Sequence, residues 1–405
     1  MTATTAQLLV IGAGPCGLSA ALAARALGIN VLLLEAEPED RERPGSRALY
    51  VHRENLERLE RISPGLGVAI GSFGIRWRAA STFYGGREVY RQEYPDFTGD
   101  GLPVYASLRQ IDTERFLLDA CKSADVGFVW SAAVSRVNST ADGVTVECAD
   151  GRSFSAHYVI GADGAQSGVR RALGIAMDGP RSTDYRVAVD LADDDSGAAP
   201  PERIMHYRHP AMSGQNLLIV PFTGGIQVDV QCASPPMSER LADPSAVREW
   251  LPKVVDPGYL DRILWISRYP CLQRVAESFI DEHRRVLLAG EAAHLFVPLG
   301  ARGMNSGIAD AYAAAAAVGL ALSAANPRRR AAAIEEYQSL RRQAAERNRS
   351  SVDSALRHLR AASGVQRAQQ AAAARLARLA PSLGAWLDTA PYGPRGPVTA
   401  ELGRY

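Results

Sequence analysis

The sequence predicts an α/β protein that carries an inserted β-rich segment and ends in helices. Three observations support this: a strand–glycine turn–helix–strand unit over residues 8–34, two hairpin patterns within 75–91 and 217–232, and an alanine-rich helical pattern from 306 to about 360. A chain of 405 residues is long enough for two to three domains. The order of the elements favours one α/β domain interrupted by a mainly β domain.

The composition is that of an ordinary globular protein. Apolar residues make up 47% and charged residues 22%, which excludes a largely disordered chain. The 45 basic residues nearly balance the 44 acidic ones, so we expect no long-range attraction to nucleic acid or to an anionic membrane. Five cysteines without a Cys-x-x-Cys motif predict neither a disulfide framework nor a zinc site, and we expect no bound metal.

The apolar runs and the two ends of the chain favour a cytoplasmic protein. The first seven residues lack the basic region of a signal peptide, and the apolar run after them is broken by glycines. The longest weakly polar run, 311–325, is mostly alanine and too short to cross a bilayer. From residue 390 on, prolines and glycines predict an irregular surface tail. We expect a monomer or a homodimer, since the helical segment 331–359 can pack within one chain or across a dimer.

The first candidate site is a glycine-rich turn between a strand and a helix. In the segment Gly-Ala-Gly-Pro-Cys-Gly at 12–17, the first glycine makes the turn, the second lets a pyrophosphate approach, and the third lets helix and strand pack closely. Glu35 ends the next strand, where a carboxylate accepts hydrogen bonds from a ribose diol. We therefore predict a Rossmann-like dinucleotide site at Gly12, Gly14, Gly17 and Glu35, rather than an ordinary glycine turn.

A second turn follows the predicted strand 158–160. Asp163 stands on this turn, and Ser167 and Arg170 lie on the helical turn after it. This arrangement suits a second contact to an extended dinucleotide. A surface turn with a helix cap explains the same residues equally well, because Asp and Ser are common caps.

A third pattern occupies residues 285–307. A short buried strand precedes Glu291, and a loop with Pro298, Gly300 and Gly303 leads into a helix near Asn305. The backbone N–H groups of 300–305 would point at an electron-poor ring that gains negative charge on reduction, because the start of a helix favours anions. We expect His294 to pack and hydrogen-bond around this loop.

Together the three segments resemble the single-component FAD-dependent aromatic hydroxylases, the para-hydroxybenzoate hydroxylase-like group A flavoprotein monooxygenases. Residues 12–17 with Glu35 resemble the family's nucleotide motif, 163–170 its D-G-x-x-S-x-x-R motif, and 290–305 its G-D-A-A-H…P…G-x-G-M-N motif. The resemblance spans roughly residues 7–345. It implies a Rossmann-like FAD-binding domain of the glutathione reductase type, an inserted mixed β-sheet substrate domain and a helical C-terminus.

The resemblance also implies domain boundaries. The FAD-binding domain would comprise 1–72, 100–175 and 271–327, and the substrate domain 73–99 and 176–270. Residues 328–405 would form the C-terminal helices and tail.

The family's cofactor residues map onto individual positions of this chain. Arg47 resembles an arginine beside the FAD, and Gln110 a glutamine near the flavin. Several positions depart from the family, since Glu291 replaces an Asp, Ala301 a Gly, Arg302 a Gln, and Glu54-Asn55 an Arg-Thr pair. The implied FAD-binding residues are Gly12, Gly14, Gly17, Glu35, Arg47, Gln110, Val134, Asp163, Arg170, Glu291, Gly300, Gly303, Met304 and Asn305.

The reaction implied by the resemblance is an aromatic hydroxylation. NAD(P)H reduces FAD, O2 then forms a flavin C4a-hydroperoxide, and the distal oxygen passes to a phenolic or other electron-rich ring. Pro298 and Gly300 would stand beside the hydroperoxide and, with Arg47, form the catalytic set. Because 12–17 is the single convincing glycine fingerprint, NAD(P)H is expected to dock transiently near the second motif, with Arg170 and Arg47 as candidate phosphate partners.

The substrate, a small aromatic molecule, is expected between the flavin and the middle sheet. Gln227, Asp229 and Gln231 share one strand face by their period of two, and that face meets either the pocket or solvent. A benzoate-like ring and a phenolic intermediate of a natural-product pathway both remain open. The further candidate substrate residues are Trp77, Tyr84 and His206.

Other functions on the same fold are alternatives. One is an FAD-dependent epoxidase or reductase acting on a non-aromatic substrate, and another is a redox-inactive FAD-binding protein. A flavin-dependent halogenase is disfavoured because its Trp-x-Trp-x-Ile-Pro signature is missing, the nearest stretch being 76–78.

Overall fold

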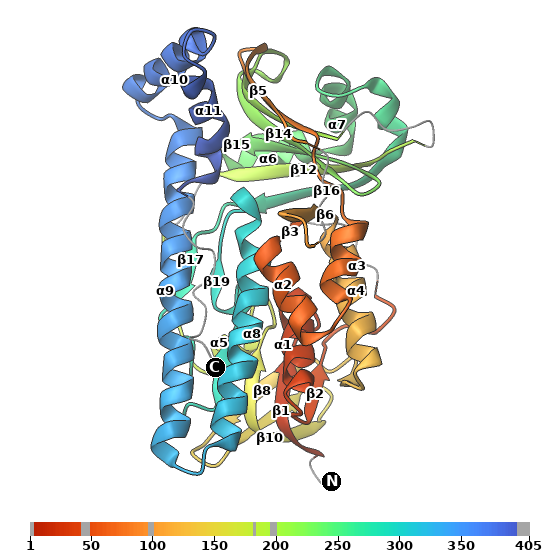
Figure 1. Cartoon of the computed structure of the whole chain (residues 1–405), viewed down its shortest axis with the longest axis vertical. Helices are drawn as coiled ribbons and strands as arrows, with labels where there is room; N and C mark the ends of the chain where they lie inside the picture. Colours follow the sequence, from red (N-terminus) through yellow and green to blue (C-terminus); the bar gives the residue numbers. More distant parts are fainter. Residues whose placement is uncertain (1–3, 42–48, 96–100, 181–183, 195–200, 395–405) are drawn as a thin grey trace.

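Two sheets stacked end to end form the body of the molecule. The computed structural model describes residues 4–41, 49–95, 101–180, 184–194 and 201–394. A seven-stranded sheet lies in the lower half of Figure 1 and another in the upper half. The helix α9 (Pro327–Arg360) runs alongside both halves.

The lower sheet is the predicted Rossmann-like element. Its strand order is β7-β2-β1-β10-β9-β8, with β18 paired to β10, and the neighbours β7, β2, β1, β10 and β18 run parallel. The ends of β1, β10 and β18 lie side by side, because Ile11 pairs with Gly161 and Gly161 with Leu288. All three candidate motifs therefore start from one edge of this sheet. The strands are β1 (Thr4–Ile11), β2 (Val31–Leu34), β7 (Gly127–Val129), β8 (Val134–Ser139), β9 (Val144–Cys148), β10 (Ser153–Gly161) and β18 (Val286–Leu288).

Helices cover the lower sheet and bury its central strand. Leu8, Leu9 and Val10 of β1 are fully buried, as expected for a parallel sheet that is covered on both faces. The helices of this half are α1 (Pro15–Ala26), α2 (Arg53–Ile62), α3 (Leu66–Phe73), α4 (Gln110–Ser123), α5 (Gly168–Ala172) and α8 (Arg302–Ser323). The three-stranded sheet β11 (Met177–Asp178), β17 (Arg274–Ala276), β19 (His294–Leu295) and the pair β3 (Tyr50–His52), β6 (Tyr105–Ser107) complete it.

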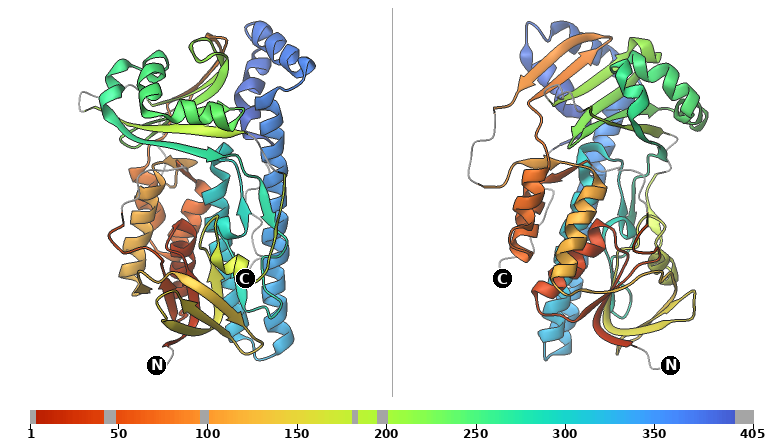
Figure 2. Two further views of the ribbon diagram at one scale, coloured as in Figure 1. Left: turned by 180° about the vertical axis from the view of Figure 1, so that it is seen from behind. Right: turned by 90° about the vertical axis from the view of Figure 1, so that its right-hand side faces the viewer.

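The upper sheet has the order β16-β12-β15-β14-β13-β4-β5 and is antiparallel except between β13 and β4. Figure 2 shows the orange β4–β5 hairpin joined to the green strands that follow much later in the chain. Both predicted hairpins, β4–β5 and β14–β15, are confirmed. The strands are β4 (Ala79–Tyr84), β5 (Arg87–Glu93), β12 (Tyr185–Ala192), β13 (Glu202–His209), β14 (Gln215–Phe222), β15 (Gly225–Cys232) and β16 (Ile263–Pro270).

The C-terminal segment packs against both halves. Ile334 and Tyr337 of α9 join the core of the lower half, and Val352 and Leu356 join a cluster with Tyr207 of the upper half. The predicted irregular surface tail is wrong for its described part, because 390–392 form a 3-10 turn in which Pro391 is buried. The other helices of the upper half are α6 (Pro235–Ala242), α7 (Pro244–Trp250), α10 (Gly364–Leu376) and α11 (Pro381–Thr389).

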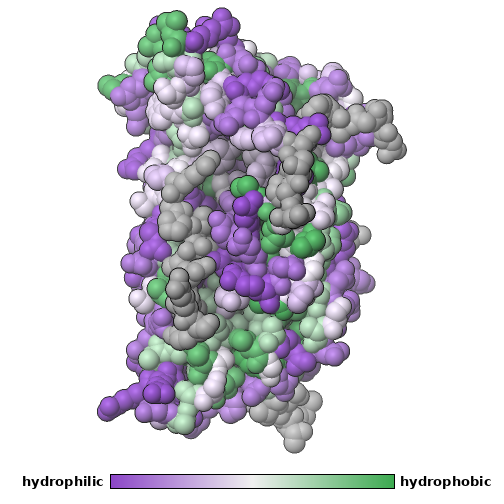
Figure 3. All heavy atoms as spheres, in the orientation of Figure 1, coloured by the Kyte–Doolittle hydropathy of each residue, from purple (hydrophilic) through white to green (hydrophobic). Residues whose placement is uncertain are grey.

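One described stretch is apolar enough to be tested as a membrane span. Leu299–Ser323 passes by length and composition, and 67% of its apolar window is buried against the rest of the molecule, as in a core helix. In Figure 3, hydrophilic residues are spread over the visible face and hydrophobic ones are scattered between them.

Candidate functional site

The three glycines of the first motif differ in the space around them. Gly12 has a φ of 102°, and a Cβ on it would lie 2.5 Å from the carbonyl oxygen of Ala162. A Cβ on Gly17 would lie 1.8 Å from the carbonyl oxygen of Gly12. A Cβ on Gly14 would meet no atom within 4 Å, because Gly14 borders a cavity. Gly12 and Gly17 therefore shape the turn, and Gly14 leaves its backbone open to a ligand.

Glu35 lies beside this turn at the end of β2. Its carboxylate accepts hydrogen bonds from the backbone N–H of Ala13 (2.5 Å) and of Glu37 (3.0 Å). Arg41 lies over the ring of Trp130 and donates to the carbonyl oxygen of Ala13 at 3.0 Å. The buried carboxylate thus stands at the glycine turn, where a ribose would follow a bound pyrophosphate.

The second motif is both a capped turn and part of the cavity wall. Ser167 caps α5 by accepting from the N–H of Arg170 at 2.9 Å. One oxygen of Asp163 accepts from the N–H of Val169 at 3.0 Å, and the other is buried without a hydrogen-bond partner in the described part of the chain. Arg170 donates to the carbonyl oxygen of Ala292 at 2.9 Å, which ties this turn to the third motif.

A buried cluster of charged and polar side chains, Asp310, His294 and Arg341, holds the third motif in place. Asp310 of α8 accepts from the N–H of Gly290 (3.0 Å), contacts the His294 ring (2.6 Å) and pairs with Arg341 of α9 (2.6 Å). Burial alone would raise the pKa of Asp310, but Arg341 and His294 hold it below its usual value. The prediction that His294 packs and bonds around this loop is confirmed. Glu291, one residue after Gly290, is exposed into the cavity.

Residues of all three motifs line one open cavity of about 980 Å³. Cys16 lines it close to Gly290 and Gly307, and its thiol donates to the carbonyl oxygen of Gly307 at 3.2 Å. Burial, followed by the charge of Asp310, raises the pKa of this thiol. The sequence-predicted residues that line the cavity are Gly14, Gln110, Arg170, Glu291, Pro298, Gly303 and Met304.

The loop from Pro298 to Ala301 separates this cavity from a second pocket. Pro298 and Ala301 line both, and Gly300 lines the second. Gly300 and Ala301 both have positive φ, 75° and 53°. For alanine this conformation costs about 1 kcal/mol, which agrees with the glycine that the resembling family prefers there.

Asn305 fixes this loop from inside the protein. Its side-chain oxygen accepts from the N–H of His52 (2.9 Å) and from Asn55 (2.8 Å), and its nitrogen donates to the carbonyl oxygens of Tyr50 and Ala301, each at 2.9 Å. Since all four hydrogen-bonding positions are used, the Asn305 side chain positions the loop rather than facing the cavity.

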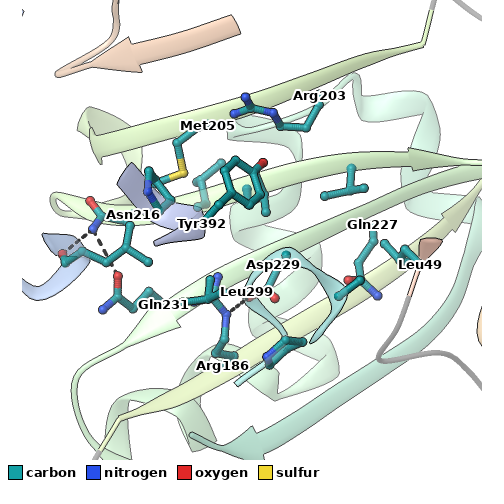
Figure 4. Close-up of a pocket in the computed structure, with 18 of the residues that line it drawn as sticks. Leu49, Arg186, Arg203, Met205, Asn216, Gln227, Asp229, Gln231, Leu299 and Tyr392 are labelled. Carbon is teal, nitrogen blue, oxygen red and sulfur yellow. Dashed lines mark hydrogen bonds and ion pairs between the residues drawn. The ribbon is translucent and has the colours of Figure 1, made fainter. Parts of the chain in front are cut away.

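The second pocket lies between this loop and the upper sheet (Figure 4). Gln227, Asp229 and Gln231 line it and are at most 9% exposed, so their shared face meets the pocket and not solvent. Asp229 forms an ion pair with Arg186 of β12 at 2.7 Å and accepts from the hydroxyl of Tyr269 at 3.1 Å. Burial alone would lower the pKa of Arg186, but Asp229 raises it above its usual value.

The C-terminal segment closes the pocket on its other side. Tyr392 lines it, and Arg302 donates to the backbone carbonyl of Tyr392 at 3.0 Å. Arg203 of β13 lines it too and pairs with Asp388 of α11. The enclosed space is about 40 Å³, room for a few water molecules, so an aromatic ring requires this cover to shift.

Comparison with known proteins identifies the family of the chain. The family model described as "FAD binding domain" matches residues 5–351. The chain belongs to this FAD-binding family. Rifampicin monooxygenase of Streptomyces venezuelae is 30% identical over 317 residues, which cover 76% of this chain and 62% of that enzyme. The chain thus spans about three-fifths of that curated relative's length.

Solved structures share the fold. The p-nitrophenol 4-monooxygenase PnpA from Pseudomonas putida matches with a TM-score of 0.77 and 24% identity, over 98% of this chain and 100% of that one. The flavin-dependent monooxygenase PieE, solved with FAD and substrate, matches with a TM-score of 0.74 and 23% identity, over 88% of this chain and 64% of that one.

The first cavity has the features that FAD requires. Gly14 leaves room for a pyrophosphate at the start of α1, which has no side-chain cap. Asp163 offers a buried carboxylate oxygen that needs a donor, such as a ribityl hydroxyl. The first N–H groups of α8, at Gly303 and Met304, face the same cavity and lack intrahelical partners.

Of the predicted site residues, Gly12, Gly17, Glu35, Asp163 and Asn305 stand beside the first cavity without lining it, and four others are not placed at either cavity. Arg47 lies outside the described residues. Val134 begins β8 and packs, partly buried, on the core of the lower half. His206 stacks on Phe83, and Tyr84 lies beside Tyr207. On β13 the pocket side belongs to Arg203 and Met205, so pleating turns His206 to the opposite face.

Sequence reasoning missed several residues of the second pocket. The pattern of residues 186–191 could have revealed Arg186. Arg186 and Asp190 alternate with the apolar residues Val187, Val189 and Leu191, so they mark a polar face on β12. Register places Gln231 directly opposite Arg186. No sequence pattern predicted Tyr392, because it follows a region without periodicity. The missed lining residues also include Leu49, Tyr50, Arg203, Asn216 and Leu359.

Proposed function

We propose that the protein is an FAD-dependent monooxygenase that hydroxylates an electron-rich aromatic small molecule with NAD(P)H and O2. The observation that carries this proposal is the loop Pro298–Ala301, which is at once a wall of the FAD cavity and of a small pocket whose lining is partly apolar and partly polar. Overall, substrate, O2, NAD(P)H and a proton give hydroxylated product, water and NAD(P)+. Bound FAD would supply the transfer of electrons to O2 and of one oxygen atom to the ring.

The chain itself would bind FAD and the substrate, orient them, and exclude water from the reacting atoms. Gly14 and the start of α1 would hold the pyrophosphate, Glu35 the ribose, and Asp163 with the start of α8 the flavin half of FAD. The buried amides of Gln227 and Gln231 and the Arg186–Asp229 pair would orient the polar groups of the ring substrate. Enclosure by Tyr392 and Leu299 would keep bulk water from the reacting atoms.

The NAD(P)H co-substrate fits the rim of the FAD cavity at the second motif. Arg170 is tied to Ala292 and lies partly in this wall, and Arg171 and Arg274 line the same region. The proposal includes transient docking of NAD(P)H there. We also propose that the enzyme is located in the cytoplasm. We propose further that it is a monomer or a homodimer and that it binds neither nucleic acid nor a membrane.

The test is an assay of the FAD-loaded protein with NADPH, isotopically labelled O2 and a panel of phenols. We expect one or more phenols to stimulate NADPH oxidation strongly and to gain one labelled oxygen atom by mass spectrometry. Stimulation without oxygen gain favours a reductase or uncoupled oxidase. If neither occurs with any phenol, while the protein retains FAD, the chain is a redox-inactive FAD-binding protein and the proposal fails.

A further inference from the structure

Two buried guanidinium groups of the second pocket have N–H groups without partners. Arg186 is 4% exposed, and its Nη1 has no hydrogen-bond partner in the described part of the chain. Arg203 is 2% exposed, and its Nε and Nη1 are likewise unsatisfied. Both side chains line the same pocket (Figure 4). Because buried donors are nearly always paired in folded proteins, these N–H groups call for acceptors on a ligand.

The positive charges of both arginines are already compensated. Arg186 pairs with Asp229 and Arg203 with Asp388. The neighbouring polar side chains on this wall, Gln227, Gln231 and Asn216, are neutral amides. A carboxylate that entered this enclosed space would therefore bring an uncompensated negative charge close to Asp229, which is costly away from water. A carbonyl or hydroxyl oxygen would satisfy the donors without that cost.

Arg186 is the better placed of the two to select a ligand. Its Nε is fixed by Asp229, which the buried hydroxyl of Tyr269 holds in turn. Figure 4 shows Arg186 and Asp229 close to Leu299, which belongs to the loop that divides the pocket from the FAD cavity. Arg203, in contrast, is fixed to the C-terminal cover through Asp388 and lies over the ring of Tyr392.

We infer that Arg186 is the residue that determines substrate specificity, and that it accepts a neutral aromatic molecule bearing a carbonyl or hydroxyl oxygen and rejects an aromatic carboxylate. This rests on the proposed function for the role of the pocket. Asp229 is the positioning residue that both orients Arg186 and cancels its charge. Removal of the charge of Asp229 alone should therefore reverse the preference.

The test uses two ligands that differ in one group. Dihydroxyacetophenone and dihydroxybenzoate, with the two hydroxyls at the same ring positions, are titrated into the FAD-loaded protein by calorimetry, and the flavin absorbance is followed in parallel. Because the carboxylate would bring an uncompensated charge into the pocket beside Asp229, and such a cost exceeds a tenfold change in affinity, the wild type should bind the ketone at least about tenfold more tightly than the carboxylate. Equal or tighter binding of the carboxylate, or no binding of the ketone, overturns the inference.

Two variants separate charge from hydrogen bonding. Asp229→Asn keeps the shape but leaves Arg186 uncompensated, so the ratio should shift toward the carboxylate by at least about tenfold. Arg186→Gln should weaken ketone binding without any gain for the carboxylate. Asp243→Asn, at the exposed cap of α7, is the matched control and should leave the ratio unchanged. An unchanged ratio in Asp229→Asn overturns the inference, and the wild-type ratio decides it even if that variant does not fold.

Product analysis keeps this inference apart from the proposed function. If oxygen is inserted into a phenol but the ketone and the carboxylate bind equally, the specificity inference fails and the function stands. If the ketone is preferred in the wild type and the preference reverses in Asp229→Asn, but no ring in the panel gains oxygen, the function fails and the recognition of a neutral oxygen by Arg186 stands.

Discussion

Arg203 on β13 and Asp388 on α11 form an ion pair in which the side chains are only 2% and 8% exposed. Asp388 also accepts a hydrogen bond from Thr82 of β4 at 2.7 Å. One carboxylate therefore ties the C-terminal helices to two neighbouring strands of the upper sheet. Since these helices lead directly to Tyr392, the pair holds the cover of the second pocket in place.

Replacement of Asp388 should therefore destabilise the protein strongly. In Asp388→Ala the buried guanidinium of Arg203 loses its partner, and we expect a loss of about 3–5 kcal/mol in the free energy of unfolding. Chemical denaturation measures this loss. Glu335→Ala is the matched control, because it removes an exposed ion pair with Arg284, which contributes about 0–1 kcal/mol. Similar losses in both variants would contradict the role assigned to Asp388.

The glycines of the first motif should separate folding from cofactor binding. Gly17→Ala places a Cβ 1.8 Å from a carbonyl oxygen, so we expect little folded protein. Gly14→Ala meets no protein atom within 4 Å, and we expect a normal melting temperature without FAD but an affinity for FAD about tenfold or more weaker. Thermal unfolding of the apoprotein and fluorescence titration with FAD measure the two effects. Unchanged FAD affinity in Gly14→Ala would argue against the assigned cavity.

His358 should make the protein less stable in mild acid. Burial lowers its pKa from 6.5 to about 4, and its ring lies 2.8 Å from the hydroxyl of Tyr207. Between these two pH values the unfolded chain binds a proton that the folded chain does not. This contribution to stability is complete above pH 6.5 and is lost as the pH falls toward 4.

The measurement is the melting temperature between pH 7.5 and 4.5. The fall in melting temperature across this range should be shallower in His358→Gln than in the wild type. His157→Gln removes an exposed histidine and should leave the slope as it is. An identical slope in all three proteins would show that His358 does not titrate as its burial requires.

Arg302 should keep the C-terminal segment closed. It donates to Asn348 at 2.8 Å and to the carbonyl oxygens of Tyr392 and Pro394 at 3.0 and 3.3 Å. Arg302→Gln loses most of these bonds, so trypsin should cleave the exposed arginines of α10 about tenfold faster. Arg349→Gln, which removes partly exposed ion pairs of α9, is the control and should change the rate little. Slower or unchanged cleavage in Arg302→Gln would contradict this closure.

Local patterns made the cofactor half of the site predictable. A glycine turn, the strand before it and Glu35 lie within about thirty residues, and their geometry depends mainly on neighbours in the chain. The polar face of Gln227, Asp229 and Gln231 was likewise evident from its period of two. What this pattern could not decide was whether the face met solvent, because that depends on the distant loop at Pro298.

The second pocket depends on long-range pairing, and its lining was only partly predictable. His206 and Tyr84 were reasonable aromatic candidates, but the parallel pairing of β13 with β4 determines which face each presents. Arg170 belongs to the second motif by sequence, yet its bond to Ala292 needs the neighbouring end of β18. Tyr392 reaches the pocket through contacts of α9 and α11 that no local pattern records.

The helix α9 affects how the molecule unfolds. It is one continuous helix of 34 residues, about 51 Å long, with Tyr337 and Arg341 in the lower half and Val352 and Leu356 in the upper. Neither half can melt without exposing part of this shared helix. Heat should therefore unfold the two halves in a single cooperative step, so that a substitution that destabilises the lower half also destabilises the half that carries the second pocket.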